Sequence, residues 1–323
     1  MKNATDNYIK YSQPNVILNI ILAVLSYSAN IFLLICATKA STWYFALIYA
    51  ILFSFTNNTV FGLLHESVHR SFSKNKIIND SFGRISAAFF PTGFHLQRGF
   101  HLGHHRRNRT DAEMFDLYYE HDNMILKNFQ WYSTLTGLYW LSVPLAALLY
   151  LFFPGFFKLS IFNRNNKFGY QSGSEEMFSS IEKEKSPIVA RAECLFSFAF
   201  QIGLFYIFDL SWDRWLLCYF LFGLNWGALQ YADHAWSKRD IIYGAWNLKI
   251  PTLIRWIFLN YHLHLAHHVN PSIPWIHLPK YMNKNDPSPN FFTIYFKMWL
   301  GPRPATEPNP KPLDKVFVEK LES

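Results

Sequence analysis

Long apolar segments, separated by polar and charged stretches, dominate the pattern along the chain. Five of them stand out, at residues 16–38, 43–64, 131–153, 193–210 and 212–231. Because a helix rises about 1.5 Å per residue, a run of about 20 residues can cross the roughly 30 Å hydrocarbon core of a bilayer. The pattern therefore predicts an all-α integral membrane protein that forms a single domain over residues 1–323.

The number of crossings decides which polar stretches share one side of the membrane. Residues 65–130, the loop 158–191 and the tail from Asp233 are all rich in Lys and Arg, which by the positive-inside tendency places them in the cytoplasm. This requires that the run 131–153 dips into the membrane and returns near Pro144, or lies along the interface. We therefore predict four transmembrane helices, one re-entrant or interfacial segment, and a cytoplasmic helical cap.

The composition agrees with a membrane protein. Half of the 323 residues are hydrophobic and 16% are charged, against roughly 25% charged residues in an average soluble protein. The net charge of +8 admits nucleic acid, anionic lipid or an acidic protein as partner. No zinc-finger spacing or RNP-like aromatic motif is present, so nucleic acid is set aside. Cys36, Cys194 and Cys218 all lie in apolar segments and are expected as small buried hydrophobic residues.

Three clusters of histidine lie after or between the apolar runs. They are His65-Glu66-Ser67-Val68-His69, His101-Leu102-Gly103-His104-His105 and His264-Leu265-Ala266-His267-His268. At the histidine frequency of this chain, chance produces an H-x-x-H-H pattern about 0.02 times and an H-x-x-x-H pattern about 0.5 times. The two H-x-x-H-H motifs therefore carry most of the argument for a metal site.

Helical spacing predicts how these side chains meet. Residues four apart share a face, so His65 and His69 can bind one metal ion. In each H-x-x-H-H motif we expect the first and fourth histidines to share a face, while the fifth, turned by about 100°, reaches a neighbouring metal ion. Eight imidazoles are too many for one zinc ion and suit two metal ions. Imidazole binds zinc, copper, nickel and iron alike, so ligand type does not name the metal.

Two other classes of metalloprotein account for less of the pattern. The string H-E-x-x-H is typical of zinc proteases, with Glu66 as general base, but it leaves both H-x-x-H-H motifs unexplained. A heavy-metal transporter needs ionisable residues inside its spans, whereas these histidines lie at or beyond span ends. The isolated His95 and His121 are interpreted as surface or satisfied core residues that do not bind a metal.

The order of the three clusters between apolar runs resembles the membrane fatty acid desaturase and hydroxylase superfamily. The surroundings of the third cluster extend the resemblance, which covers about residues 60–280. They are Asn260-Tyr261-His262, Pro271-Ser272-Ile273-Pro274-Trp275 and His277-Leu278-Pro279. The resemblance implies a non-haem centre of two Fe ions with histidine ligands, and O2 as co-substrate.

Further site residues are implied by the resemblance. Some members carry an additional histidine ligand after the last span, with an amide side chain four residues earlier. His234 and Gln230 occupy these places, so His234 is expected as a ninth ligand and Gln230 as the holder of a metal-bound water. Asp233 is expected to orient a neighbouring imidazole. Asp116, like Asp111, lies where the family often has acidic residues.

The third cluster has two candidates for its first histidine, because His262 and His264 both precede the pair at 267–268. The family often shows Asn-Tyr-His directly at that position, which favours His262. The H-x-x-H-H spacing favours His264, and we choose it, with His262 as a supporting group.

The resemblance implies oxygen-dependent desaturation of a lipid acyl chain. A hydroxylase or ketolase of a carotenoid or another long lipid is the alternative within enzymes. A metal-binding membrane protein without catalysis is the alternative from another class. The chain has no His-Pro-Gly-Gly string of a fused cytochrome b5 and no cysteine cluster for an iron–sulfur centre. We therefore expect a separate electron donor of the ferredoxin or cytochrome b5 type.

Overall fold

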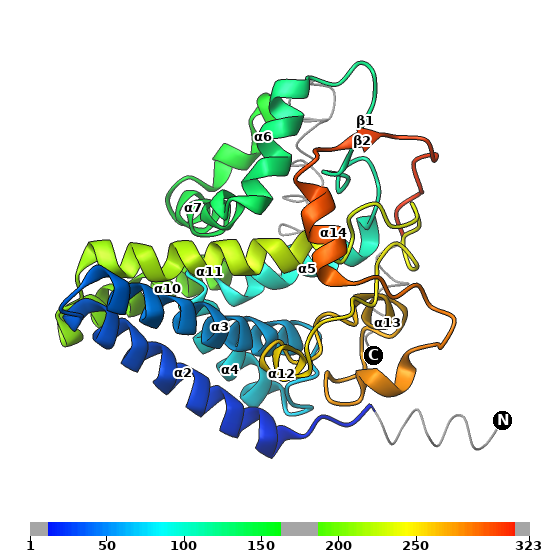
Figure 1. Ribbon diagram of the computed structural model, residues 1–323. Helices are drawn as coiled ribbons and strands as arrows, with labels where there is room; N and C mark the ends of the chain where they lie inside the picture. Colours follow the sequence, from blue (N-terminus) through cyan, green and yellow to red (C-terminus); the bar gives the residue numbers. More distant parts are fainter. Residues whose placement is uncertain (1–11, 163–186, 314–323) are drawn as a thin grey trace.

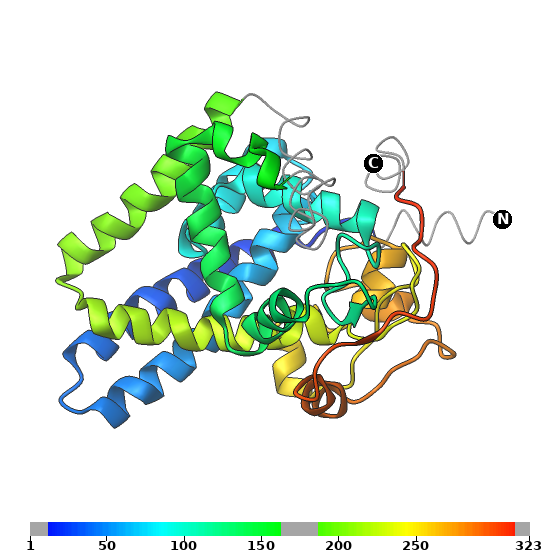
Figure 2. The same cartoon turned by 90° about the horizontal axis from the view of Figure 1, so that it is seen from above.

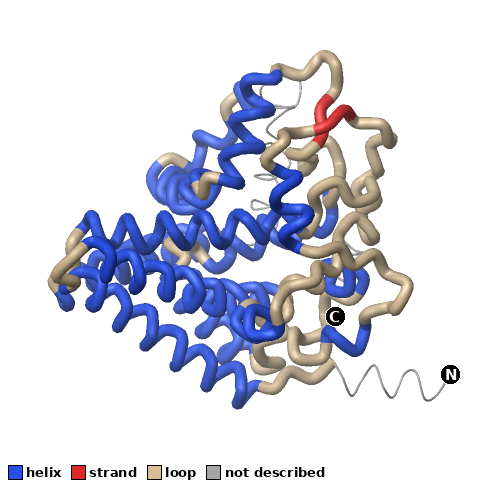
Figure 3. The backbone as a smooth tube through the Cα atoms, in the orientation of Figure 1, coloured by secondary structure: helices blue, strands red, loops and turns tan. Residues whose placement is uncertain are grey.

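Helices make up most of the molecule, as the apolar pattern predicts (Figure 3). The computed structural model describes residues 12–162 and 187–313. One pair of short parallel strands, β1 (Leu117–Tyr118) and β2 (Arg303–Pro304), is the sheet of the described part. Most of the loop 158–191, predicted to be cytoplasmic, lies outside the described residues.

Two helical hairpins form the frame of the molecule (Figure 1). The first consists of α2 (Val16–Lys39) and α3 (Trp43–Val68), and the second of α10 (Pro187–Phe208) and α11 (Trp212–Ala232). Helix α3 packs against both α2 and α11, so the two hairpins share one core. The predicted helices therefore form where the apolar runs lie, with ends displaced by a few residues.

The turns of the two hairpins lie at the same end of this frame. The backbone N–H of Ser211 donates to Oγ1 of Thr38 at 3.3 Å, which joins the second turn to the first hairpin. The guanidinium of Arg214 lies 3.5 Å from the centre of the Trp43 ring. The other ends of α3 and α11 therefore also lie together, on the right of Figure 1, where the short helices gather.

Within the described residues, three helices are long and apolar enough to cross a membrane: α2, α3 and α10. They indicate an integral membrane protein. The predicted span at 212–231 forms a helix of 21 residues, α11, but is not among the three. The polar side chains of Asp213, Arg214, Asn225 and Gln230 lower its hydropathy. A crossing by α11, and the cytoplasmic placement of the end opposite the two turns, stay predictions.

The run 131–153 is bent sharply. Helices α6 (Met124–Leu135) and α7 (Leu138–Phe152) meet at 98°, a geometry that fits a re-entrant segment or a broken span. The predicted break at Pro144 is wrong, since Pro144 lies inside α7. The chain turns instead at Gly137, whose φ is 76°, a conformation that glycine adopts without strain. Helix α7 then packs on both α10 and α11 (Figure 2).

Helix α5 (Phe94–Arg107), which follows α4 (Lys76–Phe89), is fixed at its start by α10. The carboxylate of Glu193 accepts the backbone N–H of His95 at 2.8 Å and lies 2.7 Å from Nδ1 of the same residue. The Nε of Arg84 donates to Glu193 at 2.8 Å. His95 is therefore a core residue outside the three histidine clusters, one of the two ordinary roles predicted for it. His121 is exposed and stacks on Tyr119, as expected for a surface residue.

Three short helices follow α11, namely α12 (Thr252–Ile257), α13 (His264–Val269) and α14 (Phe291–Met298). Short 3-10 turns lie after α7, at Pro154–Lys158 and Ser160–Phe162, and between α13 and α14, at Leu278–Tyr281. Asparagine side chains cap the starts of several helices by accepting backbone N–H groups. These caps are Asn15, Asn75, Asn123 and Asn290. The three cysteines are unpaired; Cys194 and Cys218 are buried, as predicted, whereas Cys36 is half-buried.

The contact between α11 and α6 leaves no room for a side chain at Gly227, where a Cβ would lie 2.4 Å from the carbonyl oxygen of Thr134. We expect Gly227→Ala to destabilise the protein by about 1–3 kcal/mol, because overpacking forces the backbone apart. The measurement is the midpoint of thermal unfolding in detergent. Gly203→Ala in α10, with nothing within 4 Å of the added Cβ, should keep or raise the midpoint. Equal midpoints for the two variants would contradict this packing.

Candidate metal centre

Nine histidine side chains meet at the end of the frame opposite the two hairpin turns. They come from four places: the end of α3, helix α5, the position of His234 just after α11, and helix α13. Two groups of four each bring one nitrogen per ring within 4.8 Å of the others. The first group is His65, His69, His101 and His267, and the second is His104, His234, His264 and His268.

His105 completes the set. Its Nε2 lies 3.1 Å from Nε2 of His101 and 3.0 Å from Nε2 of His267, so it belongs with the first group. Its ring centre is also 4.4 Å from that of His268 in the second group. The arrangement is therefore five imidazoles beside four, with His105 at the boundary between the two groups.

The two H-x-x-H-H motifs contribute to the groups in opposite senses. In α5 the first and fifth histidines join the first group and His104 turns to the second. In α13 the first and fifth histidines join the second group and His267 turns to the first. The predicted pairing of first and fourth histidines is therefore wrong. A side chain four residues further along a helix is rotated by about 40° from the first, whereas one three residues further is rotated by about 60° in the opposite direction. The first and fifth histidines of each motif are therefore closer in direction than the first and fourth.

Acidic side chains and one carbonyl oxygen orient several of these rings through Nδ1. The carboxylate of Asp233, which is fully buried, lies 3.5 Å from Nδ1 of His264, in the place expected for an orienting group. The carbonyl oxygen of Gly244 lies 2.8 Å from Nδ1 of His234. Glu113 lies 3.4 Å from Nδ1 of His104.

Two of these contacts, and a third made by Glu66, were not identified from the sequence. Glu113 and Gly244 lie eight or more residues from the histidines that they orient, so no local spacing marks them. Glu66 was considered only as a protease base, although it follows His65 directly. In the structure its Oε2 accepts the backbone N–H of Trp275 at 3.1 Å, and its Oε1 lies 3.9 Å from Nδ1 of His65. Glu66 therefore fixes the chain at Trp275 and lies near the His65 ring without a hydrogen bond to it.

Asp116 lies one step further from the histidines. It pairs with Arg109 at 2.8 Å and accepts hydrogen bonds from the Tyr231 hydroxyl at 3.0 Å and from the Trp236 N–H at 2.6 Å. Burial alone would raise the pKa of Asp116, but Arg109 and these hydrogen bonds hold it below its usual value. The acid thereby fixes the chain on both sides of His234. Asp111 pairs with Arg239 at 2.7 Å, away from both groups.

The choice between His262 and His264 has a clear geometric outcome. His264 lies in the second group, whereas the ring of His262 is buried outside both. The carbonyl oxygen of His262 accepts the N–H of Leu248 at 2.8 Å, which ties the approach to α13 to a neighbouring segment. The H-x-x-H-H spacing therefore selected the histidine that lies in a group.

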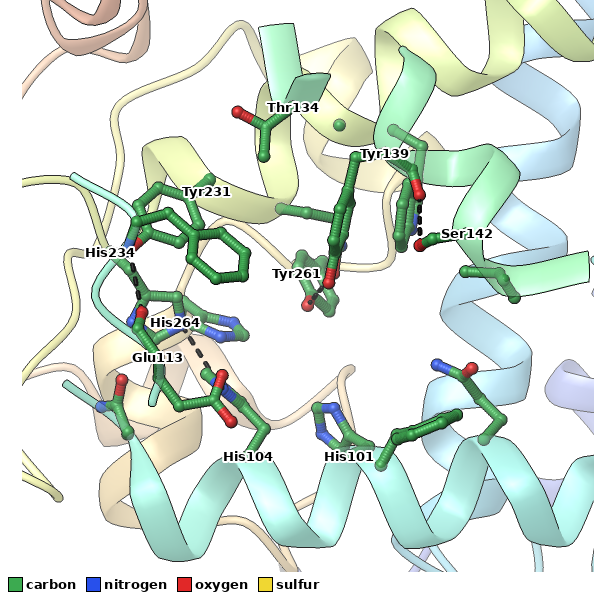
Figure 4. Close-up of a pocket in the computed structure, with 18 of the residues that line it drawn as sticks. His101, His104, Glu113, Thr134, Tyr139, Ser142, Tyr231, His234, Tyr261 and His264 are labelled. Carbon is green, nitrogen blue, oxygen red and sulfur yellow. Dashed lines mark hydrogen bonds and ion pairs between the residues drawn. The ribbon is translucent and has the colours of Figure 1, made fainter. Parts of the chain in front are cut away.

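A cavity of about 230 Å³ lies beside the histidines, between α5, α7 and α11. His101 and His104 point into it from α5, opposite Tyr139 and Ser142 of α7 (Figure 4). Gln230 also lines it, and its Oε1 accepts a hydrogen bond from Tyr261 at 3.1 Å. Most of the other lining is apolar or aromatic: Phe100, Phe115, Val143, Ala146 and Trp226. Asn108 and Glu113 are further polar residues of the lining, so the histidines lie against a cavity whose wall is more apolar than polar.

The donor set fits a pair of metal ions. Among the described residues, the buried Nε2 atoms of His65 and His268 have no hydrogen-bond partner. Other pairs bring two Nε2 atoms within 2.8 to 3.1 Å, the separation of neighbouring ligands about 2.1 Å from one ion. Burial and the neighbouring imidazoles lower the pKa of His101, His105 and His267 well below its usual range. These rings are therefore neutral, the form that binds metal.

Removing one ring of the second group should remove metal. We expect His264→Ala to lower the metal content of the purified protein by at least half, because a buried nitrogen ligand is lost. His262→Ala, two residues away and outside both groups, serves as the matched control and should keep the full metal content. Elemental analysis of detergent-purified protein gives the result. Greater loss of metal in His262→Ala than in His264→Ala would reverse the assignment.

The carboxylate of Asp233 should act through His264. We expect Asp233→Asn to weaken metal binding by about 10–100-fold, because the His264 ring loses the carboxyl group that lies 3.5 Å from its Nδ1 and helps to set its orientation. A competitive chelator titration measures the change. Asp209→Asn, an exposed position at the far end of the frame, is the control and should leave the affinity unchanged. Equal affinities for the two variants would show that Asp233 does not support the metal ligand.

Comparison with known proteins agrees with this geometry. The family model described as fatty acid desaturase matches residues 41–296, which include all nine histidines. A comparison with curated proteins finds no match. The matched region covers most of the chain, from the start of α3 to α14. The chain therefore belongs to the fatty acid desaturase family.

Proposed function

We propose that this protein is an oxygen-dependent desaturase of lipid acyl chains that uses two iron ions. The observation that carries the proposal is the position of two groups of buried imidazoles at one side of a mainly apolar cavity. His101, His104, His234 and His264 belong both to the groups and to the cavity wall. A substrate in the cavity therefore lies directly beside both candidate metal positions.

The first iron would be held by the first group with His105, and the second by the second group. When bound, the irons supply oxidation of an unactivated C–H bond by dioxygen, chemistry that no side chain provides. The Gln230 amide, fixed by Tyr261, has an oxygen suited to hold a water near the second group.

The other walls of the cavity position the substrate. Phe100, Tyr139, Val143 and Trp226 present apolar surface to a hydrocarbon and exclude water from its path. The polar residues Gln97, Thr134 and Ser142 interrupt this surface and could fix a substrate by hydrogen bonds. Small changes in this positioning decide between removal of a second hydrogen and formation of an alcohol, so a hydroxylase or ketolase remains the alternative outcome of the test below.

The proposal includes a separate electron donor of the ferredoxin or cytochrome b5 type and an active site on the cytoplasmic side. The net charge of +8 and the many Lys and Arg residues between the apolar runs support both parts.

Metal analysis and lipid profiling test the proposal together. We expect about two irons per chain in active, detergent-purified protein, and a new double bond in the lipids of cells that express the gene. New hydroxyl or keto groups would assign the alternative activity instead. Zinc in place of iron in an active preparation would contradict the oxygen chemistry, and unchanged lipids with bound metal would indicate a metal-binding protein without catalysis.

The size of the cavity should determine which acyl chains the protein accepts. We expect Ala146→Phe to reduce product severalfold or to shift it towards shorter chains, because the ring fills space beside Val143. The lipid profile of expressing cells and the iron content of the purified variant are measured together. Ala199→Phe, on the exposed face of α10, adds the same ring outside the cavity and should change neither. An unchanged profile for Ala146→Phe would mean that the substrate lies elsewhere.

A further inference from the structure

A second apolar hollow lies on the other side of α11. It has a volume of about 410 Å³, within the range of about 300–1,000 Å³ typical of ligand sites. Helices α3 and α11 form its floor, and α12 and α14 close it on the outside. Trp226 and Gln230 of α11 face the cavity beside the histidines, whereas Leu221, Asn225 and Ala228 face this second hollow. We call it the outer groove.

The outer groove opens toward the apolar surface of the molecule. On α3, one of the helices able to cross a membrane, Ile48 and Ile51 are 49% and 43% exposed. On α14, Phe292 and Phe296 line the groove and are 50% and 66% exposed. Side chains of this kind, exposed along a membrane-crossing helix, face acyl chains. The medium that reaches the groove from the side is therefore the hydrocarbon of the bilayer.

Two cations border the outer groove where the chain enters α12. None of the residues that line it carries a charge. The exposed Lys249 precedes the lining residue Ile250, and Nε of Arg255 donates to the carbonyl oxygen of Ile250 at 3.1 Å. Neither cation forms an ion pair with any residue in the described part of the chain. The groove thus passes from apolar walls to two unpaired positive charges.

We propose that the outer groove binds one anionic glycerophospholipid, with one acyl chain between α3, α11 and α14 and the phosphate beside Lys249 and Arg255. The gradient from apolar wall to positive rim matches the two parts of such a lipid. Because the groove is open at its side, the second acyl chain can remain in the bilayer. A free fatty acid has the same charge and one chain, so it is the competing ligand in the test.

The bound lipid stabilises the segment that leads to the metal centre. Ile250 and Phe258 both line the groove, and Tyr261 and His264 follow within a few residues. An acyl chain in the groove fills the space between this segment and α3, so it favours the native position of α12 and α14. The inference does not depend on the proposed reaction, and its test does not measure activity.

The test uses the full chain in detergent. We expect the purified protein to retain about one anionic phospholipid per chain, detected by native mass spectrometry and identified after extraction. We expect added phosphatidylglycerol to raise the midpoint of thermal unfolding, and phosphatidylcholine or oleate at the same concentration to raise it less. Stabilisation by oleate as strong as by phosphatidylglycerol, or by phosphatidylcholine to the same extent, would overturn the proposal.

Two variants separate the charged end from the apolar walls. The double substitution Lys249→Gln with Arg255→Gln changes exposed side chains, and we expect about 30-fold weaker binding of phosphatidylglycerol, since two cations near an anionic lipid are lost. Ala228→Trp fills the groove and should remove the retained lipid. Ala199→Trp, exposed on α10, is the matched control and should retain it. Full lipid retention in Ala228→Trp, or unchanged affinity in the double variant, would contradict the assigned site.

Discussion

The crowding of nine imidazoles in a buried space is the constraint on which the rest of the structure depends. Water is excluded from most of these rings, and each neighbour disfavours a positive charge on the next. The pKa values of His101 and His105 in α5 and of the three histidines of α13 are therefore lowered, and these rings are held neutral. Neutral nitrogen atoms brought so close together without protons between them are favourable only around cations. The frame must therefore bring four separate segments to one place.

Several features of the fold serve that purpose. The turns of both hairpins meet at one end, which brings the ends of α3 and α11 together at the other. Glu193 fixes the start of α5, and Asp116 with Arg109 fixes the chain around His234. Asp233 and Glu113 then set individual rings, and Glu66 fixes the chain at Trp275. Each of these groups is an acid that is not itself one of the nine histidines, so the centre is supported from outside its candidate ligands.

The sequence predicts the helices and the histidines well, because apolar runs and short motifs are local signals. Features that depend on contacts between elements were missed. The bend falls at Gly137 and not at Pro144, because α7 leaves α6 where only glycine fits against the backbone of α11. The pairing of histidines within each H-x-x-H-H motif depends on where the partner helix lies. Glu113 and Gly244 could not be found at all, since nothing in their surroundings marks them as neighbours of an imidazole.

Because each H-x-x-H-H motif contributes histidines to both groups, binding of the two metal ions should be coupled. Helices α5 and α13 each give ligands to both groups, so neither metal position can be completed without ordering residues of the other. The first ion to bind orders side chains that the second ion also needs, so the second ion binds with a smaller loss of conformational entropy. By thermodynamic linkage, each ion then favours binding of the other. Loading is therefore expected to be cooperative, with half-filled molecules scarce at equilibrium and with loss of one ion promoting loss of the other.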